Sequence, residues 1–254
     1  MKVELDLMII YCFAGTTWIQ EIINLVQNAG NSSEIPIYVR HTFIECHFPC
    51  LPAEFDKWVS GSHTGIVQTH LSSGFFEKTL EESQAKFIVV LRNPKDMLVS
   101  YYNFYRMNKL YNFSGSWDDF FKMFKDKKLS HGDYFDVQLS WWKLRDDPRI
   151  LILKYEDMQR SPEDMTRKVM NHLEISLSDD IVDEIAKKTS FAVMKDNPLL
   201  NYTGIPIMKT EISPFMRKGI VGDWRNYFSK EQSDYVDKLS DAHFKFCRLF
   251  LKEK

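Results

Sequence analysis

The chain has 254 residues, of which 44% are hydrophobic and 27% are charged, so it can fill one substantial core. Its 33 basic and 35 acidic side chains give a formal net charge of −2. That balance excludes a nucleic-acid-binding protein that relies on bulk positive charge, but it allows a local basic pocket. No apolar run approaches the ~20 residues that a membrane-spanning helix needs, and Glu4 and Asp6 make a poor secretion signal. We therefore expect a single domain over residues 1–254, without a membrane or nucleic-acid partner.

The first predicted element is a buried strand at residues 7–12, an apolar run that ends before a small-residue turn. Apolar residues from Trp18 to Val26 then recur at helical spacing and predict an amphipathic helix. The turn between this strand and this helix contains Gly15, Thr16 and Thr17. The N–H groups of a first helical turn attract anions, and glycine lets a phosphate approach the backbone closely. The lysine of a nucleoside triphosphate P-loop is missing, and a small-residue turn is also common without any ligand.

Possible metal ligands gather after this helix, at His41, Cys46, His47 and Cys50. Their spacing matches no standard zinc pattern, and Pro49 interrupts it. The sequence therefore predicts no metal site. The four cysteines of the chain fit reduced thiols in the cytosol.

Three further apolar runs predict short strands, at residues 65–69, 86–91 and 149–153. Because helical patterns lie between them, we expect an α/β fold: a mostly parallel central sheet flanked by helices on both faces. Ligands of such sheets bind at the carboxyl ends of the strands. His70 and Arg92 each follow a predicted strand, as Gly15 does, so these positions can converge at one edge.

Capping signals predict where several helices begin. They lie at Ser116 before an aromatic helical pattern, at Ser161 with Pro162, and at Ser229 with Gln232 before the final helix. Residues 28–64 and 195–220 show no pattern and predict loops over a pocket.

Four segments together resemble the cytosolic sulfotransferases in order and approximate spacing. They are Gly-Thr-Thr-Trp at residues 15–18, Thr-His at 69–70, Arg-Asn-Pro-Lys-Asp at 92–96 with Ser-Tyr-Tyr at 100–102, and Phe-Met-Arg-Lys-Gly at 215–219 followed by Gly-Asp-Trp at 222–224. That family transfers a sulfuryl group from 3′-phosphoadenosine 5′-phosphosulfate (PAPS) to an alcohol, phenol or amine. The resemblance covers nearly the whole chain. It implies a cytoplasmic enzyme with a PAPS-binding strand–loop–helix and a small-molecule acceptor.

The resemblance also implies a role for each residue of the cofactor site. Backbone amides around Gly15, Thr16 and Thr17 would hold the 5′-phosphosulfate, and Arg92 with Ser100 would hold the 3′-phosphate. The segment of Phe215, Met216, Arg217, Lys218 and Gly219 would close over that phosphate, where arginine forks suit a dianion. Trp18 and Phe191 would stack on the adenine, near Tyr155 and Thr189. Taken without the resemblance, these residues are a strand-end arginine, a surface basic pair and core aromatics.

His70 is implied as the general base that removes the proton of the acceptor. An imidazole can do this near neutral pH, although a lone strand-end histidine is more often structural. The acceptor pocket is implied at Phe43, Gln68, Phe104 and Tyr202. An aromatic pocket suits a small phenol or a hydrophobic alcohol, and the same residues could also be plain core.

Two departures from the family pattern bear on catalysis. Members usually carry a lysine where this chain has Phe13, and commonly another where it has Gln68. Preorganised charge of the first kind is often worth ~3–4 kcal/mol in a transition state. The alternative function is therefore a degenerate relative that binds nucleotide with little or no turnover. A phosphoryl-transfer enzyme is disfavoured, because the loop lysine and a clear magnesium-binding carboxylate are both missing.

The two ends of the chain suggest further departures. Members of the family commonly carry a longer segment before the first strand, so we expect a shortened amino-terminal region. Members also commonly dimerise through a segment after the Gly-Asp-Trp motif. Here Arg225 and Asp234 keep the expected end charges, but Lys230 replaces a central valine. Two-fold symmetry would bring Lys230 toward its own copy, so we expect a monomer or a weak homodimer.

Overall fold

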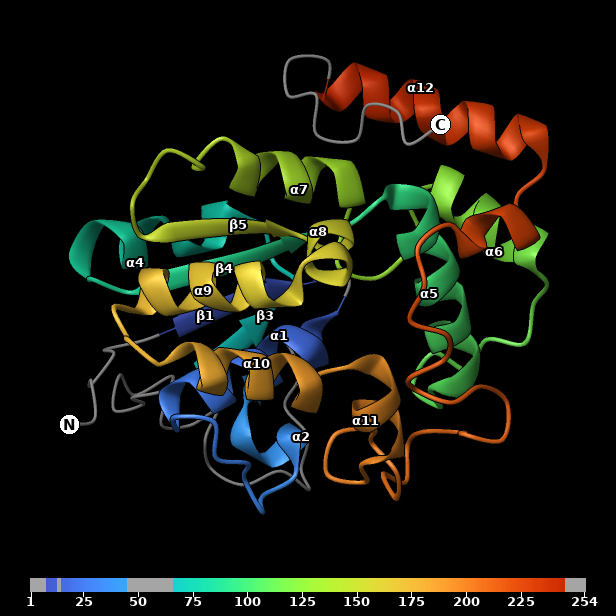
Figure 1. Ribbon diagram of the computed structural model, residues 1–254. Coiled ribbons are helices and arrows are strands. Elements are labelled where there is room, and N and C mark those ends of the chain that lie inside the picture. The colour runs from blue at the N-terminus through green and yellow to red at the C-terminus, as the bar shows by residue number, and fades with distance from the viewer. Residues whose placement is uncertain (1–7, 13–14, 45–65, 245–254) are drawn as a thin grey trace.

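The fold comes from a computed structural model of the chain (Figure 1). It describes residues 8–12, 15–44 and 66–244, and it describes side chains from residue 15 onward, except at residues 42 and 244. The predictions that concern Phe13, Cys46, His47 and Cys50 fall outside these ranges. Within them, no three His, Cys, Asp or Glu side chains are arranged to hold a metal ion. No helix there is long and apolar enough to cross a membrane.

A five-stranded, fully parallel sheet forms the centre of the molecule, in the order β2-β3-β1-β4-β5. The strands are β1 Met8–Cys12, β2 Thr42–Phe43, β3 Ile66–Thr69, β4 Lys86–Leu91 and β5 Ile150–Lys154. Four of them match the predicted strands within a residue or so at each end. The fifth, β2, lies inside a stretch predicted to be irregular, because two residues are too short to show any alternation. The α/β class is confirmed.

Helices cover both faces of this sheet (Figure 1). One layer contains α1 Thr16–Gln27, α8 Tyr155–Arg160, α9 Pro162–Leu173 and α10 Asp179–Lys188. Ile19, Ile23 and Val169 from this layer are completely buried against Ile88 of β4. Because helices bury both faces of a parallel sheet, its strands are nearly continuous runs of apolar residues.

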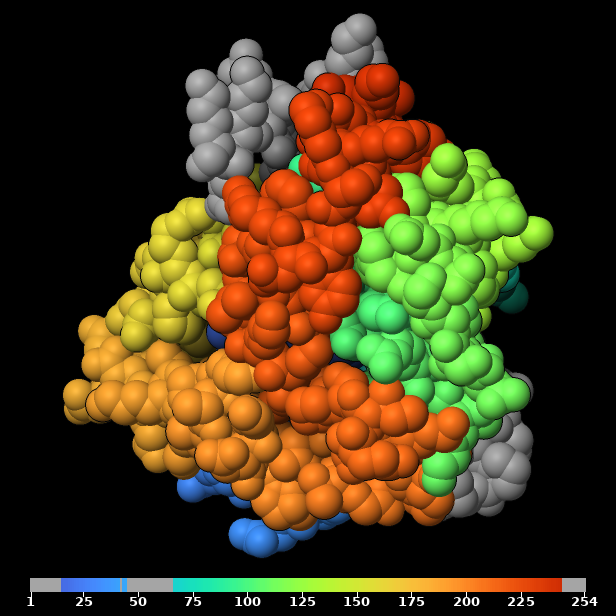
Figure 2. Space-filling view, turned by 90° about the vertical axis from the view of Figure 1, so that its right-hand side faces the viewer, coloured from blue at the N-terminus to red at the C-terminus, as the bar shows by residue number. Residues whose placement is uncertain are grey.

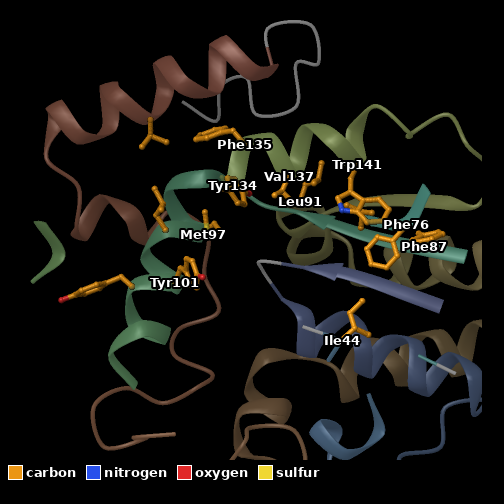
Figure 3. Packing of buried hydrophobic residues seen from close by; sticks show 14 of the residues in the cluster. Ile44, Phe76, Phe87, Leu91, Met97, Tyr101, Tyr134, Phe135, Val137 and Trp141 are labelled. Atoms are coloured by element: carbon orange, nitrogen blue, oxygen red, sulfur yellow. The ribbon is translucent and has the colours of Figure 1, made fainter. Parts of the chain in front are cut away.

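The opposite layer is built around aromatic side chains. It contains α7 Tyr134–Trp142 and α12 Lys230–Phe244, with η1 Ser73–Phe76 and α4 Glu77–Glu82 toward one end and α5 Pro94–Met107 and α6 Trp117–Lys125 toward the other. Figure 3 shows Trp141 of α7 beside Phe76 and Phe87, with ring centroids 5.8 and 5.4 Å away. The indole N–H of Trp141 donates to the Leu71 carbonyl at 3.0 Å, so this buried polar atom is satisfied.

The predicted helix starts are confirmed by their caps. Ser116 and Asp119 form a reciprocal capping box at α6, and Pro162 occupies the first turn of α9. Ser229 and Gln232 exchange hydrogen bonds at the start of α12, at 3.0 and 3.1 Å. The two capping boxes satisfy N–H groups that a first helical turn leaves without intrahelical partners, whereas Ser161 makes no side-chain hydrogen bond at the start of α9.

A long irregular segment leads from α11 Phe191–Asp196 to the short helix η2 Asp223–Asn226, as the sequence predicts for residues 195–220. Figure 2 looks at the side toward which the strands point in Figure 1, and there this segment lies on the surface between α5–α6 and α8–α9. The other stretch predicted to be irregular, residues 28–64, is not wholly so. It contains the single turn α2 Ile37–Arg40 as well as β2.

Candidate active site

One cavity of about 740 Å³ opens at the carboxyl ends of the strands, beneath the segment before η2. Its wall includes every residue that the sequence placed in the cofactor or acceptor site. These are Gly15, Thr16, Thr17, Trp18, Phe43, Gln68, His70, Arg92, Ser100, Phe104, Tyr155, Thr189, Phe191, Tyr202, Phe215, Met216, Arg217, Lys218 and Gly219. Segments far apart in sequence therefore meet where parallel sheets bind their ligands. The role of each residue stays a prediction.

The amino terminus of α1 lines the cavity and follows β1, the strand that lies between β3 and β4. Gly15 has a left-handed backbone with φ of 77°, and a Cβ there would lie 3.0 Å from the Tyr155 ring. No side chain caps the helix, and its first turn contains no acidic residue. The helix dipole therefore acts on the cavity without a compensating carboxylate on its own turn.

Trp18 and Arg92 meet at the ring of Tyr155. The Arg92 guanidinium lies 4.1 Å from the centroid of that ring, and Trp18 packs against it edge-on at 5.6 Å. Arg92 also donates to the carbonyl of Ile220 at 3.3 Å, and its own carbonyl accepts from the Tyr134 hydroxyl at 2.8 Å. Two polar hydrogens remain buried without partners, on Nε1 of Trp18 and Nε of Arg92. The site therefore has donors in place that its own side chains do not use.

Arg217 and Lys218 are held by a carboxylate from η2. Asp223 accepts from Nη2 of Arg217 at 2.5 Å and from Nζ of Lys218 at 2.6 Å. Burial alone raises the pKa of Asp223, but the hydrogen bonds from Lys218, Asn226 and Arg217 outweigh it and hold the pKa below its ordinary value. The carboxylate is thus ionised at neutral pH and offsets part of the positive charge that this segment brings to the cavity.

A second buried carboxylate fixes the same segment to the scaffold. Asp96 in the first turn of α5 accepts from the backbone N–H groups of Gly222 at 2.6 Å and Trp224 at 2.9 Å. Its neighbour Lys95 points away from the cavity and pairs with Asp237 of α12 at 2.8 Å. The motif at residues 92–96 therefore joins the carboxyl end of β4 to the segment around η2, in addition to supplying Arg92.

His70 follows β3 and lies among aromatic rings. The ring of Phe43 meets it edge-on at 4.9 Å, and the ring of His131 lies 4.9 Å away at an interplanar angle of 35°. The nearby Gln68 side chain accepts a short hydrogen bond from the amide of Gln20 on α1. This pairing uses the Gln68 oxygen inside the protein, so it limits the contact that Gln68 can offer an acceptor.

Further aromatic side chains line the same cavity. Tyr202 packs against Phe215 with centroids 4.1 Å apart, and Phe104 meets Phe215 edge-on at 6.5 Å. The Tyr202 hydroxyl shares a hydrogen bond with Thr17, and burial raises the pKa of the phenol, so Tyr202 stays neutral. An apolar wall with a few polar groups is typical of small-molecule sites.

Residues 7–248 match the family model for the sulfotransferase domain. The chain belongs to the sulfotransferase family. It is 40% identical to rat sulfotransferase 1C2 over 253 residues, covering 95% of this chain and 86% of the relative. It is 38% identical to rat sulfotransferase 1A1 over 256 residues, with 96% and 88% of the two chains covered.

Solved structures agree with this family. Mouse sulfotransferase SULT7A1, complexed with PAP, superposes with a TM-score of 0.73 at 26% identity, covering 94% of this chain and 84% of that one. A retinol dehydratase, in complex with androsterone and the inactive cofactor PAP, reaches a TM-score of 0.82 at 23% identity and covers 97% and 82%. The second likeness shows the shared fold.

Two histidines that line this cavity were not among the residues predicted for the cofactor or acceptor site. His131 faces His70, and His41 also lies on the wall, where burial and the Arg40 charge lower the pKa of its imidazole to about 3. The sequence pattern placed only His70 after a strand. His131 belongs to a loop and carries no strand-end signal in the sequence; in the structure residues 131 and 132 both adopt left-handed φ, of 69° and 83°.

The left-handed turn at Gly219 allows a direct test of whether residues 215–219 take part in nucleotide binding. Its φ is 64°, and an added Cβ would lie 2.1 Å from the Phe191 ring. We expect Gly219→Ala to weaken binding of 3′-phosphoadenosine 5′-phosphate (PAP) at least about tenfold, since the ring and segment must separate. Gly204→Ala is the matched control, with φ of 86° and no atom within 4 Å of the new Cβ. Calorimetric titration should separate the two variants, and equal affinities would contradict this assignment.

Proposed function

We propose that the protein transfers a sulfuryl group from PAPS to the hydroxyl, or amine, of a small phenolic or hydrophobic acceptor. The observation that carries this proposal is the lining of one cavity. The amino terminus of α1 and three basic side chains, Arg92, Arg217 and Lys218, line the same cavity as His70, which lies among aromatic rings. Family membership and the PAP complexes of its structural neighbours support the same activity.

The residues present fit PAPS. The backbone N–H groups at Gly15, Thr16 and Thr17 would hold its phosphosulfate, because nothing else caps that helix terminus. Arg92 and Ser100, with Arg217 above them, would hold the 3′-phosphate. Trp18 and Phe191 provide ring faces for adenine, and the buried Nε1 of Trp18 needs an acceptor atom.

When bound, PAPS would supply the sulfuryl group that passes to the acceptor oxygen, and the bridging phosphate oxygen would keep the electron pair of the broken sulfur–oxygen bond in the released PAP. His70 takes the proton that the acceptor oxygen loses. Phe43, Phe104 and Tyr202 hold the acceptor ring and exclude water from the reacting atoms. The dipole of α1 and the arginine charge stabilise negative charge that accumulates on the phosphates.

A second candidate is a degenerate sulfotransferase that binds PAP or PAPS with little or no turnover. The specific observation in its favour is Phe13, which stands where relatives usually carry a lysine. Lys218 is a neighbouring cation, but its ammonium is paired with Asp223 at 2.6 Å, which lowers the charge it offers the cavity.

One assay separates the two candidates. The protein is incubated with labelled PAPS and a panel of phenols and hydrophobic alcohols, and PAP binding is measured in parallel. Product together with PAP binding supports the active enzyme. PAP binding without product supports the degenerate relative, and absence of both contradicts the assignment to PAPS.

The nucleotide preference gives a sharper prediction. We expect PAP to bind more tightly than AMP, because Arg92, Ser100 and Arg217 would all contact the 3′-phosphate that AMP lacks. Arg92→Ala should weaken PAP binding by about 10- to 100-fold, the range for losing a hydrogen bond to a charged group, and should leave AMP binding nearly unchanged. Arg145→Ala is the control, since Arg145 pairs with Asp146 away from the cavity. Equal wild-type affinities for the two nucleotides would overturn the 3′-phosphate site.

The state of assembly and the location remain predictions. Lys230 pairs within its own helix with Asp234 at 2.5 Å, and both side chains are exposed. We expect sedimentation velocity at micromolar concentration to show a monomer or a weak dimer, and a stable dimer there would contradict the argument from Lys230. The cytoplasmic location implied by the resemblance also stays a prediction.

A further inference from the structure

Residues 210–221, which we call the covering segment, pass over the cavity on the surface of the molecule (Figure 2). The chain is fixed to α5 on both sides of this segment. Before it, the backbone N–H of Lys209 donates to the Met107 carbonyl at 2.7 Å. After it, the N–H of Gly222 donates to the buried carboxylate of Asp96 at 2.6 Å. The segment itself contains no helix or strand, so its position over the cavity depends on the contacts that it makes between these two points.

The last three residues of the covering segment bury few side-chain atoms of their own. Gly219 has no side chain, and Ile220 and Val221 are 46% and 38% exposed. Two backbone carbonyls are held by side chains of the scaffold instead. Nε2 of Gln159 on α8 donates to the Gly219 carbonyl at 2.7 Å, and Arg92 donates to the Ile220 carbonyl at 3.3 Å. Because little apolar surface is buried here, these hydrogen bonds contribute a large share of the closure.

Gln159 also connects the covering segment to the ring at which the predicted nucleotide site meets. Its amide nitrogen carries two hydrogens, and the second bond goes to the Tyr155 hydroxyl at 3.0 Å. The guanidinium of Arg92 lies over that tyrosine ring and Trp18 packs against its edge. One neutral amide therefore ties the segment to the floor of the nucleotide site.

The two side chains that hold the segment differ in charge. Arg92 is a cation, so the proposed 3′-phosphate competes with the Ile220 carbonyl for its donors. The amide of Gln159 is neutral and keeps its bond to the Gly219 carbonyl whichever nucleotide is bound. Gln159 is thus the contact that can keep the segment closed independently of the 3′-phosphate.

We propose that Gln159 is a positioning residue that holds the covering segment closed over the bound nucleotide and thereby slows the release of PAP. The inference rests on the proposed function, because it takes PAP as the molecule that leaves the cavity. Since Gln159 acts through the Gly219 carbonyl, its loss should weaken PAP and AMP by the same factor, whereas loss of Arg92 should weaken PAP alone. The loss of one neutral hydrogen bond is expected to change a rate by about 3- to 10-fold.

The first test measures nucleotide release in Gln159→Met, which keeps the length of the side chain but has no N–H donor. PAP dissociation is followed by stopped-flow tryptophan fluorescence, since Trp18 lines the cavity. We expect dissociation to be about 3- to 10-fold faster with an unchanged association rate, and calorimetry to show the same factor for PAP and AMP. Gln27→Met is the matched control, because Gln27 is exposed at the end of α1 and does not line the cavity.

The second test follows the segment in the free protein. Arg217 and Lys218 lie inside it, and trypsin cleaves after such residues only when the chain opens locally. We expect cleavage after residues 217 and 218, assigned by mass spectrometry, to be about 3- to 10-fold faster in Gln159→Met than in the wild type. Cleavage after Lys187 at the end of α10 should stay unchanged.

The two tests together can overturn the proposal. Unchanged PAP release in Gln159→Met would show that the amide does not hold the segment, and a loss confined to PAP would make Gln159 part of the 3′-phosphate site. Faster cleavage at all sites would mean general destabilisation. A wild type that binds no PAP overturns the proposed function and with it the role in release, and proteolysis of the free protein then decides alone whether Gln159 holds the segment.

Discussion

His70→Ala is expected to lower kcat by about 10²- to 10⁴-fold, the range that a positioned general base contributes. The dissociation constant for PAP should change only within a few-fold. The reason is the distribution of groups in the cavity: His70 lies against Phe43 and His131, whereas Arg92 lies against Tyr155. Turnover is measured with labelled PAPS and the best phenol of the panel, and PAP affinity by calorimetry.

The neighbouring imidazole makes a double variant necessary. His131 lies 4.9 Å from His70 and can take up a proton in its place, so part of the activity can survive in His70→Ala. We expect His70→Ala combined with His131→Phe to remove that remainder. Added imidazole should restore some turnover to His70→Ala if only the base is missing. Full activity in the single variant would place the base elsewhere, and loss of PAP binding would make His70 a structural residue.

The fold follows from the sequence because its strands carry a strong local signal. The run Lys86–Leu91 is apolar at nearly every position, as expected for a strand buried on both faces, and it forms β4 with these bounds. Helix starts such as Ser116 are equally local, since a cap involves residues a few positions apart. Strand β2 carries no such signal: Thr42 and Phe43 pair with Val67 and Gln68, which are distant in sequence.

The candidate site, like the fold, was predictable from the sequence only in part. The resemblance brought the strand-end residues together, and the structure places them in one cavity. It gave no indication of which residues pair inside the protein. Gln68 is bonded to Gln20, and Asp223 holds both Arg217 and Lys218. These pairings join different elements, so the local pattern cannot reveal them. His131 was missed for the same reason, because its loop meets β3 only in the folded chain.

Because Lys218 is paired with Asp223, the replacement of the usual loop lysine by Phe13 matters more for catalysis. Phe13 lies outside the described residues and stands two residues before Gly15 in the sequence. In relatives that position carries a cation for the leaving phosphate. Neither Gln68, bonded to Gln20, nor Lys218, bonded to Asp223, supplies an uncompensated charge in its stead.

Phe13→Lys is therefore expected to raise turnover at least ~10²-fold, the lower range for one well-placed donor to a developing charge. PAPS affinity should change less, because the new ammonium acts on the transition state more than on the bound ground state. Phe13→Met is the matched control: its side chain is flexible and close to lysine in length, but it carries no charge. Initial rates with a broad phenol panel, together with thermal unfolding of each variant, provide the measurement.

A stable, folded Phe13→Lys protein that is no faster than wild type or Phe13→Met would show that the missing charge does not limit catalysis. The loop would then take a course in which position 13 faces away from the phosphates, and an unstable Phe13→Lys would show the same by burying its ammonium without a partner.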